Sequence, residues 1–434
     1  MDVSIAHERV VLPNGLTVLI HEDHSVPVVG VNVWYHVGSK DERVGRTGFA
    51  HLFEHVMFEG SAHVPPGQFD RLLESAGGVN NGSTTTDRTN YWVNVPKSAL
   101  ELVLWLEADR MGFLLQAMTQ EKLDVQREVV KNERRQSYEN RPYGLAFETL
   151  LGELYPAGHP YRHPVIGRME DLSAASLDDV NAFFRTFYSP GNASLAVAGD
   201  VSTAATLRLV ETYFADIPAG PAIPLMAPQP VALGGSPHEV LEDGVHLARL
   251  YMAWPSPPHY TPEDAALELL AGILAGGKTS RLYRRLVYEA RLAQDVSAFQ
   301  NGCELAGSFF VIVTAKPGVG LEGLEAAVRA EIARLVEEGV SDDERLRTVN
   351  QIESGMVRAL ERVGGFGGKA DRLNEYLFFA GDPAFVARDL ARYRSVDGRE
   401  VLDVANRRLC LSPAVALSVV PHGRRELAST GGDA

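Results

Sequence analysis

The alternation of apolar and polar positions predicts strands and short helices at the start of the chain. Residues 9–12 and 16–21 hold β-forming side chains on either side of Pro13-Asn14-Gly15. Asn-Gly between such segments is a strong hairpin signal. We expect a third strand at 28–37 and one half-exposed strand at 79–95, which is rich in β-formers and polar at alternate positions. Helices are expected at 48–60, from Pro66 to Gly77-Gly78, and at about 119–139.

The second half of the chain repeats this mixture of elements. An amphipathic helix is predicted at 261–275 and a buried strand at 309–314. Residues 180–200 and 401–421 each run from a helix through a Ser-Pro turn into a strand, which suggests duplication. The proline-rich, uncharged stretch 217–231 is typical of an extended linker. The sequence therefore predicts an α+β protein with two similar domains, 1–225 and 226–434.

Composition is that of an ordinary globular protein. Of the 434 residues, 45% are apolar and 22% are charged, and no apolar run approaches the length of a membrane span. The first residues lack the form of a signal peptide, so we expect a cytoplasmic protein, or a periplasmic one if a signal peptide was removed. A net charge of −15 disfavours nucleic acid as a partner, and Cys303 and Cys410 are too few for a disulfide framework. Any metal must then be held by histidine and carboxylate.

The helix at 48–60 contains the candidate chemistry. His51 and His55 are four residues apart and project from one helical face, and Glu54 stands beside them. The order H-x-x-E-H is the inverzincin signature, in which two histidines bind zinc and the glutamate holds a water. The alternative is a solvated helix face. Against it, apolar side chains surround the three residues and predict a buried helix, on which a metal would satisfy all three groups.

Glu133 is the carboxylate best placed to complete the site. It lies three and four residues after Val130 and Val129 on the helix at 119–139, and so projects from the apolar, inward side, whereas Glu128 points away. Two histidines and one glutamate would leave a fourth zinc position for water. The sequence thus predicts one zinc ion per chain, held by His51, His55 and Glu133.

These motifs resemble the pitrilysin or insulinase-like family of zinc peptidases, which includes mitochondrial processing peptidases and bacterial relatives. In that family, H-x-x-E-H is followed by a ligand glutamate 75 to 80 residues later, and here 133 − 55 = 78. The matching segments are 48–60, 77–78 with Asn81 and Thr84, 133–135, 138–144, 159–161, 166–167, 187–192 and 199–200. The resemblance implies two homologous domains, each a mainly antiparallel sheet packed against helices, that together form half of a clamshell.

The resemblance also implies a function, that of a zinc metalloendopeptidase. Glu54 would be the catalytic base and would pass the proton to the leaving nitrogen. The polar strand at 79–95 would hold an extended peptide by backbone pairing, with Asn81, Gly82, Ser83 and Thr84 as substrate contacts. The glycine-rich segment 364–368 lacks the ending of a phosphate loop, and we interpret it as a flexible connection.

Two positions depart from the family pattern. Gln126 stands where a further glutamate is usual, a change that should weaken an outer electrostatic contact without removing the metal. Val287 and Gln294 stand where the family has an arginine and a tyrosine that contact the substrate. We therefore predict a heterodimer in which a homologous subunit supplies that pair. A register shift could let Arg285, Tyr288 or Arg291 substitute, and a self-sufficient homodimer and a non-catalytic scaffold subunit are the alternatives.

Overall fold

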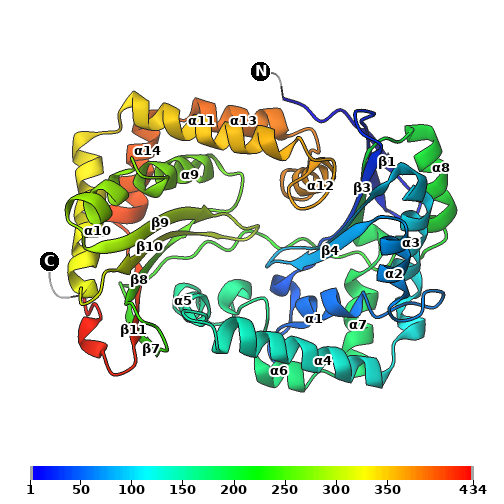
Figure 1. Cartoon of the computed structure of the whole chain (residues 1–434), viewed down its shortest axis with the longest axis horizontal. Helices are drawn as coiled ribbons and strands as arrows, with labels where there is room; N and C mark the ends of the chain where they lie inside the picture. Colours follow the sequence, from blue (N-terminus) through cyan, green and yellow to red (C-terminus); the bar gives the residue numbers. More distant parts are fainter. Residues whose placement is uncertain (1–2, 432–434) are drawn as a thin grey trace. The chain divides into compact units, whose positions relative to one another are not determined.

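The computed structural model describes residues 3–431, which form two compact units (Figure 1). The first unit contains the chain up to Arg134, His163–Leu225 and Gly355–Ala387. The second contains Arg135–Arg162, Met226–Ser354 and the chain from Arg388 onward. One break falls between Leu225 and Met226, inside the proline-rich stretch. A single break at 225 would place residues 135–162 in the first unit and residues 355–387 in the second. In the structure, residues 135–162 belong to the second unit and residues 355–387 to the first.

The first unit is built on a six-stranded sheet in the order β1-β2-β6-β3-β5-β4. Its strands are β1 (Glu8–Val11), β2 (Thr17–Glu22), β3 (Val28–Tyr35), β4 (Val79–Thr84), β5 (Thr89–Pro96) and β6 (Ala193–Gly199). The predicted hairpin of β1 with β2 is confirmed, and β2 with β6 is the parallel pair in an otherwise antiparallel sheet. The central strand β6 is buried along its whole length, which explains its continuous run of small and apolar residues.

The second unit repeats the first sheet without its outermost strand. Its five strands have the order β7-β11-β8-β10-β9, and β7 with β11 is again the parallel pair. They are β7 (His238–Asp243), β8 (Arg249–Ser256), β9 (Ala293–Asn301), β10 (Gly307–Ala315) and β11 (Val415–Pro421). Each strand corresponds to one in the order β2-β6-β3-β5-β4, so the predicted repeat of 180–200 in 401–421 extends to the topology of both sheets.

Helices pack against both sheets. The longer helices of the first unit are α1 (Phe49–Val56), α2 (Gln68–Ser75), α3 (Leu100–Ala117), α4 (Gln120–Arg134), α6 (Met169–Ser173), α7 (Leu177–Phe187), α8 (Thr203–Phe214) and α12 (Lys369–Ala380). Those of the second unit are α5 (Ala146–Leu154), α9 (Pro262–Ala275), α10 (Leu321–Glu338) and α14 (Gly398–Val404). The helices α11 (Asp342–Ala359) and α13 (Val386–Ser395) contain two of the division points between the units. The predicted mixture of helices with mainly antiparallel sheets is confirmed.

The segment 79–95 is two strands, not the one that we predicted. A turn at residues 85–88 reverses the chain, with the Thr85 amide donating to the Arg88 carbonyl at 2.8 Å. The Thr85 hydroxyl accepts from the amides of Asp87 and Arg88, the local bonding by which threonine stabilises turns. The β-forming pattern continued across this turn and concealed it. The hairpin makes β4 the edge strand of its sheet.

The helix α12 is anchored on the sheet by a buried carboxylate. Asp371 accepts hydrogen bonds from the Trp34 indole at 2.8 Å and from the Asn90 amide at 2.9 Å. The preceding glycine-rich segment is packed, not a loose connection: a Cβ on Gly30 of β3 would lie 2.6 Å from Gly364 Cα. Glycine at both positions allows two backbones to touch. The residues 355–387 are thereby fixed to the first sheet.

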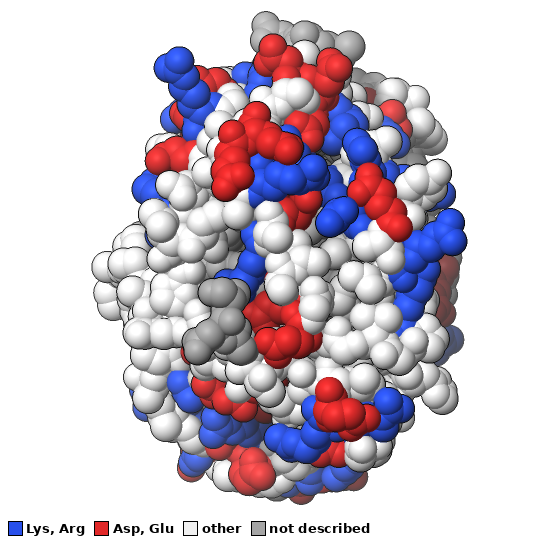
Figure 2. All heavy atoms as spheres, turned by 90° about the vertical axis from the view of Figure 1, so that its left-hand side faces the viewer, with Lys and Arg blue, Asp and Glu red and all other residues white. Residues whose placement is uncertain are grey.

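No helix among the described residues is both long and apolar enough to cross a membrane. On the side of the molecule shown in Figure 2, acidic and basic side chains are mixed above and below a largely uncharged middle region, which contains one small acidic cluster. The view shows no broad basic patch that would attract nucleic acid to this face.

We predict that Asp371→Ala lowers the free energy of unfolding by about 2–4 kcal/mol, because it strands the buried Trp34 and Asn90 donors without an acceptor. Urea denaturation measures the loss. Glu361→Ala, at an exposed position of the same segment, is the control and should unfold as the natural protein does. Equal stability of both variants would contradict the anchoring role of Asp371.

Candidate metal centre

The helix α1 is held in place by a buried carboxylate at its start. Gly48 has φ = 88°, and the amides of Gly48 and Ala50 donate to the Glu42 carboxylate at 2.9 and 2.8 Å. This side chain is fully buried, and burial raises the pKa of Glu42 well above its ordinary value. On the inner side of the helix, Leu52 and Phe53 are completely buried. The Glu42 cap and the buried inner face of α1 together fix the direction in which His51 and His55 point.

The helix α1 packs on α4 (Figure 1). His51 and His55 on α1 and Glu133 on α4 come together there. The ligand atoms of the three side chains lie within 4.8 Å of one another. His51 Nε2 is 3.7 Å from Glu133 Oε1, and His55 Nε2 is 3.2 Å from Glu133 Oε2. Ligands of tetrahedral zinc are separated by about 3.3 Å, which follows from bonds of about 2.0–2.1 Å. The two histidine–carboxylate distances are close to this spacing, so the three residues fit a zinc ion.

The charge states of these groups suit metal binding as well. Burial lowers the pKa of His51 to about 4, so this imidazole is neutral at physiological pH. The hydrogen bond with His55 lowers the pKa of Glu133, which keeps the carboxylate ionised. A neutral imidazole and a carboxylate are the forms in which these side chains bind metals.

Glu54 lies beside the three ligand residues but is held by β4. The Thr84 hydroxyl donates to Glu54 Oε2 at 2.7 Å. A Cβ on Gly82 would lie 3.2 Å from Glu54 Cγ and 3.3 Å from Glu54 Oε1. Glycine at this position therefore leaves room for the Glu54 carboxylate to pack against β4. Burial raises the pKa of Glu54 above its ordinary value. The carboxylate thus projects from α1, and its contacts with β4 fix its orientation.

The other predicted contacts of β4 divide into two groups. Asn81 Oδ1 accepts from the Gly82 amide at 2.8 Å, beside Glu54. Ser83 donates to Asn90 Oδ1 at 2.6 Å, and the Arg88 guanidinium donates to the carbonyl and hydroxyl of Ser83. Gly82 and Thr84 therefore contact Glu54, whereas the Asn81 and Ser83 side chains are bonded within the β4–β5 hairpin.

Gln126 connects α4 to the turn after α1. Its side-chain amide donates to Glu59 Oε1 at 2.6 Å, and the residue is almost completely buried. Since the three candidate ligands lie on these two helices, the bond helps to fix their relative position.

In the second unit, Val287 precedes the β9 edge strand and Gln294 is the second residue of that strand. Val287 lies in the π-helical turn Tyr283–Glu289 and is half-buried, and Gln294 is exposed on β9. Of the possible substitutes, Arg285 is 3.7 Å from Glu289, and Tyr288 is 76% exposed.

Three residues that position the site were missed by the sequence interpretation. Glu42 caps α1 from a loop, Arg88 binds Ser83, and Asp371 holds Asn90 from a segment 281 residues further along the chain. The Glu42 and Arg88 contacts are short in sequence but follow no helical or strand period, and the Asp371 contact depends on tertiary folding. The one available signal was that an acidic residue precedes the α1 helix, whose amides it can bind.

Comparison with known proteins gives consistent results for both halves. The family profile described as Insulinase (Peptidase family M16) matches residues 17–164, and that described as Peptidase M16 inactive domain matches residues 174–352. The chain is 32% identical over 335 residues to the zinc protease PqqE of Helicobacter pylori, with 76% of this chain and 74% of that protein covered.

Two further relatives extend over more of the chain. It is 26% identical over 412 residues to the probable mitochondrial-processing peptidase subunit beta of Arabidopsis thaliana, covering 91% of this chain and 75% of that protein. The crystal structure of a protease from Helicobacter pylori superimposes with a TM-score of 0.89 at 27% identity, covering 96% of this chain and 100% of that chain.

We predict that Glu133→Gln weakens zinc binding by about a hundredfold or more, because it removes the one anionic ligand of the three. Competition with a chromophoric chelator measures the affinity. Glu128→Gln is the matched control, since Glu128 lies on the same helix but pairs with Lys131 on the exposed side. If both variants bind zinc as the natural protein does, Glu133 is not a ligand.

Proposed function

The chain belongs to peptidase family M16, and on this premise we propose that it is a zinc metalloendopeptidase that hydrolyses peptides held in extended form. The observation that carries the proposal is the meeting of His51, His55 and Glu133 beside Glu54. Three ligands and one adjacent carboxylate are what hydrolysis at a catalytic zinc site requires.

Glu54 is the proposed general base. Zinc at the three ligands would supply a Lewis acid to a peptide carbonyl and to the attacking water. Thr84 fixes Glu54 through Oε2, and Gly82 leaves space at Oε1. We assign to this carboxylate the removal of a proton from water and its delivery to the leaving nitrogen. The contacts with Thr84 and Gly82 on β4 hold the Glu54 carboxylate in one orientation.

The edge strand β4 is the proposed substrate-binding strand. No other strand of the described residues pairs with its outer side. The Gly82 amide bonds Asn81 Oδ1, an acceptor that the carbonyl of an extended peptide can replace. Backbone pairing of this kind selects for extended shape and places few demands on substrate side chains.

We further infer that the active enzyme is a heterodimer. Val287 and Gln294 offer no positive charge and no phenolic hydroxyl at the two positions where the family carries arginine and tyrosine. A homologous subunit with that pair would supply the missing donors. The sequence similarity to a mitochondrial-processing peptidase subunit beta supports a subunit role for this chain.

We predict that Glu54→Gln retains stoichiometric zinc but loses hydrolysis by a factor of about 10²–10⁴, the usual contribution of a general base. Zinc content and cleavage of a quenched fluorescent peptide are measured on the assembled enzyme. Glu74→Gln, an exposed glutamate on α2, is the control and should keep full activity. Undiminished cleavage by Glu54→Gln would exclude Glu54 as the base.

The heterodimer proposal is tested by mixing the pure chain with a homologous subunit that carries the arginine and tyrosine. We expect hydrolysis to rise on the order of a hundredfold, as the addition of transition-state donors does. Replacement of the partner's arginine by glutamine should abolish the rise. If the isolated chain is as active as the mixture, the enzyme is a homodimer or a monomer.

A further inference from the structure

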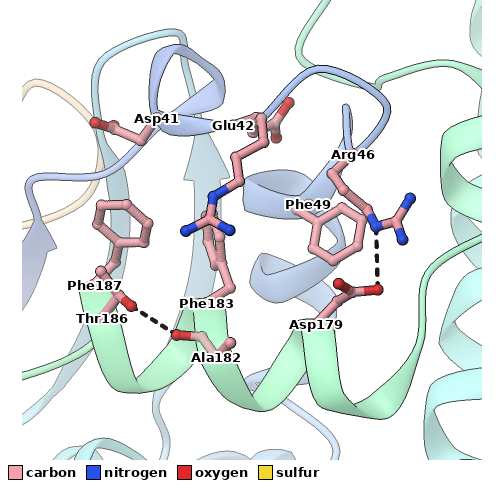
Figure 3. A pocket seen from close by; sticks show the side chains of 10 residues that line it. Asp41, Glu42, Arg46, Phe49, Asp179, Ala182, Phe183, Thr186 and Phe187 are labelled. Carbon is pink, nitrogen blue, oxygen red and sulfur yellow. Dashed lines mark hydrogen bonds and ion pairs between the residues drawn. The ribbon is translucent and has the colours of Figure 1, made fainter.

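A pocket outside the metal centre lies between the segment 41–49 and α7 (Figure 3). Neither the three metal ligands nor Glu54 lines it. Its residues come from the loop before α1, from the first residue of α1 and from one face of α7. It is therefore a separate site that shares one helix with the metal centre.

The floor of the pocket is aromatic. Phe183 and Phe187 on α7 are half-buried, with ring centroids 4.8 Å apart, and Phe183 is 6.2 Å from the ring of the buried Phe49. Figure 3 shows the side chains of Phe183 and Phe187 rising from α7 toward the loop. Phenyl rings open to solvent at a hollow are stabilised by an apolar group that covers them.

The carboxylates of the pocket are all engaged within the chain. Asp179 bonds the Arg46 guanidinium at 3.1 Å, and Asp41 bonds Lys40 Nζ at 2.9 Å. Glu42 is occupied by the amides at the start of α1. The acidic groups thus have their partners and do not require a cation from solution.

The Arg43 guanidinium is different. It lines the pocket from an exposed stretch, and no residue of the described range 3–431 forms a hydrogen bond or an ion pair with it. The next residue, Val44, is 97% exposed. The pocket therefore combines an apolar floor with one uncommitted cation, and a carboxylate is the group that a guanidinium binds in planar, paired hydrogen bonds.

We propose that this pocket binds an apolar carboxylate, with its aromatic or branched group on Phe183 and Phe187 and its anionic end on Arg43. A free aromatic acid and the C-terminus of a peptide share this chemistry. The ligand would also contact Phe49, two residues before His51 on the metal-binding helix. The site does not depend on the proposed hydrolysis, because none of its residues belongs to the metal centre.

The test is isothermal titration calorimetry, with N-acetylphenylalanine and the peptide Ala-Ala-Phe titrated separately into the full chain. Each acid is compared with its C-terminal amide, which has the same shape without the charge. Every titration is repeated on zinc-loaded and chelator-treated protein, so that binding at the metal is recognised. The variants are Arg43→Gln, which removes the charge, and Ala182→Trp, which fills the pocket from an exposed position on α7. Arg185→Gln, exposed on α7 but outside the pocket, is the control.

We expect the natural chain to bind the amides at least about tenfold more weakly than the acids, as the loss of a charged hydrogen bond implies. The Arg43→Gln variant should bind the acids more weakly by the same factor. Ala182→Trp should abolish binding, whereas Arg185→Gln and chelation should change nothing. Binding of both acids would identify the free acid as sufficient, and binding of the peptide alone would identify the chain terminus. The proposal is overturned if neither acid binds, or if each acid and its amide bind with equal affinity. It is also overturned if the Arg43→Gln variant binds the acids normally, or if removal of zinc abolishes binding.

Discussion

The contact between α1 and α4 is the constraint on which the candidate site depends. It brings two imidazoles and a carboxylate within metal-binding distance. Such an arrangement is costly in a partly buried place unless a metal satisfies the groups, because each loses hydration and gains few hydrogen bonds from the protein. Other contacts hold the two helices in place. Glu42 accepts hydrogen bonds from the start of α1, and Gln126 on α4 donates to Glu59 in the turn after α1.

Glu54, the proposed base, is oriented by a different set of contacts. Glu54 is bonded to Thr84 on β4, and β4 is bonded through Arg88 and Asn90 to the sheet and to Asp371 on α12. The Arg88 guanidinium also stacks 5.2 Å from the Trp34 ring, so the hairpin has little freedom to tilt. Glu54 shares α1 with His51 and His55, but its carboxylate is bonded to β4, outside the group of three candidate ligands.

Local patterns predicted the parts of the protein that depend on local chemistry. The H-x-x-E-H spacing identified α1, the inward position of Glu133 identified the third member of the group, and Asn14-Gly15 identified the first hairpin. The turn at 85–88 was missed because threonine favours strands and stabilises turns with the same side chain. The packing of the 364–368 segment was missed because glycine signals flexibility as readily as close backbone contact. The Glu42 contact is a local loop contact without a helical or strand period, and the Asp371 contact joins positions that only the folded chain brings together.

The zinc K-edge X-ray absorption spectrum of the purified, zinc-loaded chain tests the proposed metal centre directly. We expect about four nitrogen and oxygen neighbours at about 2.0–2.1 Å, together with the outer-shell scattering of two imidazoles. In Glu133→Gln the two-imidazole signal should persist while the carboxylate contribution is lost. A sulfur neighbour at about 2.3 Å, or the scattering of only one imidazole, would contradict a centre made of His51, His55 and Glu133.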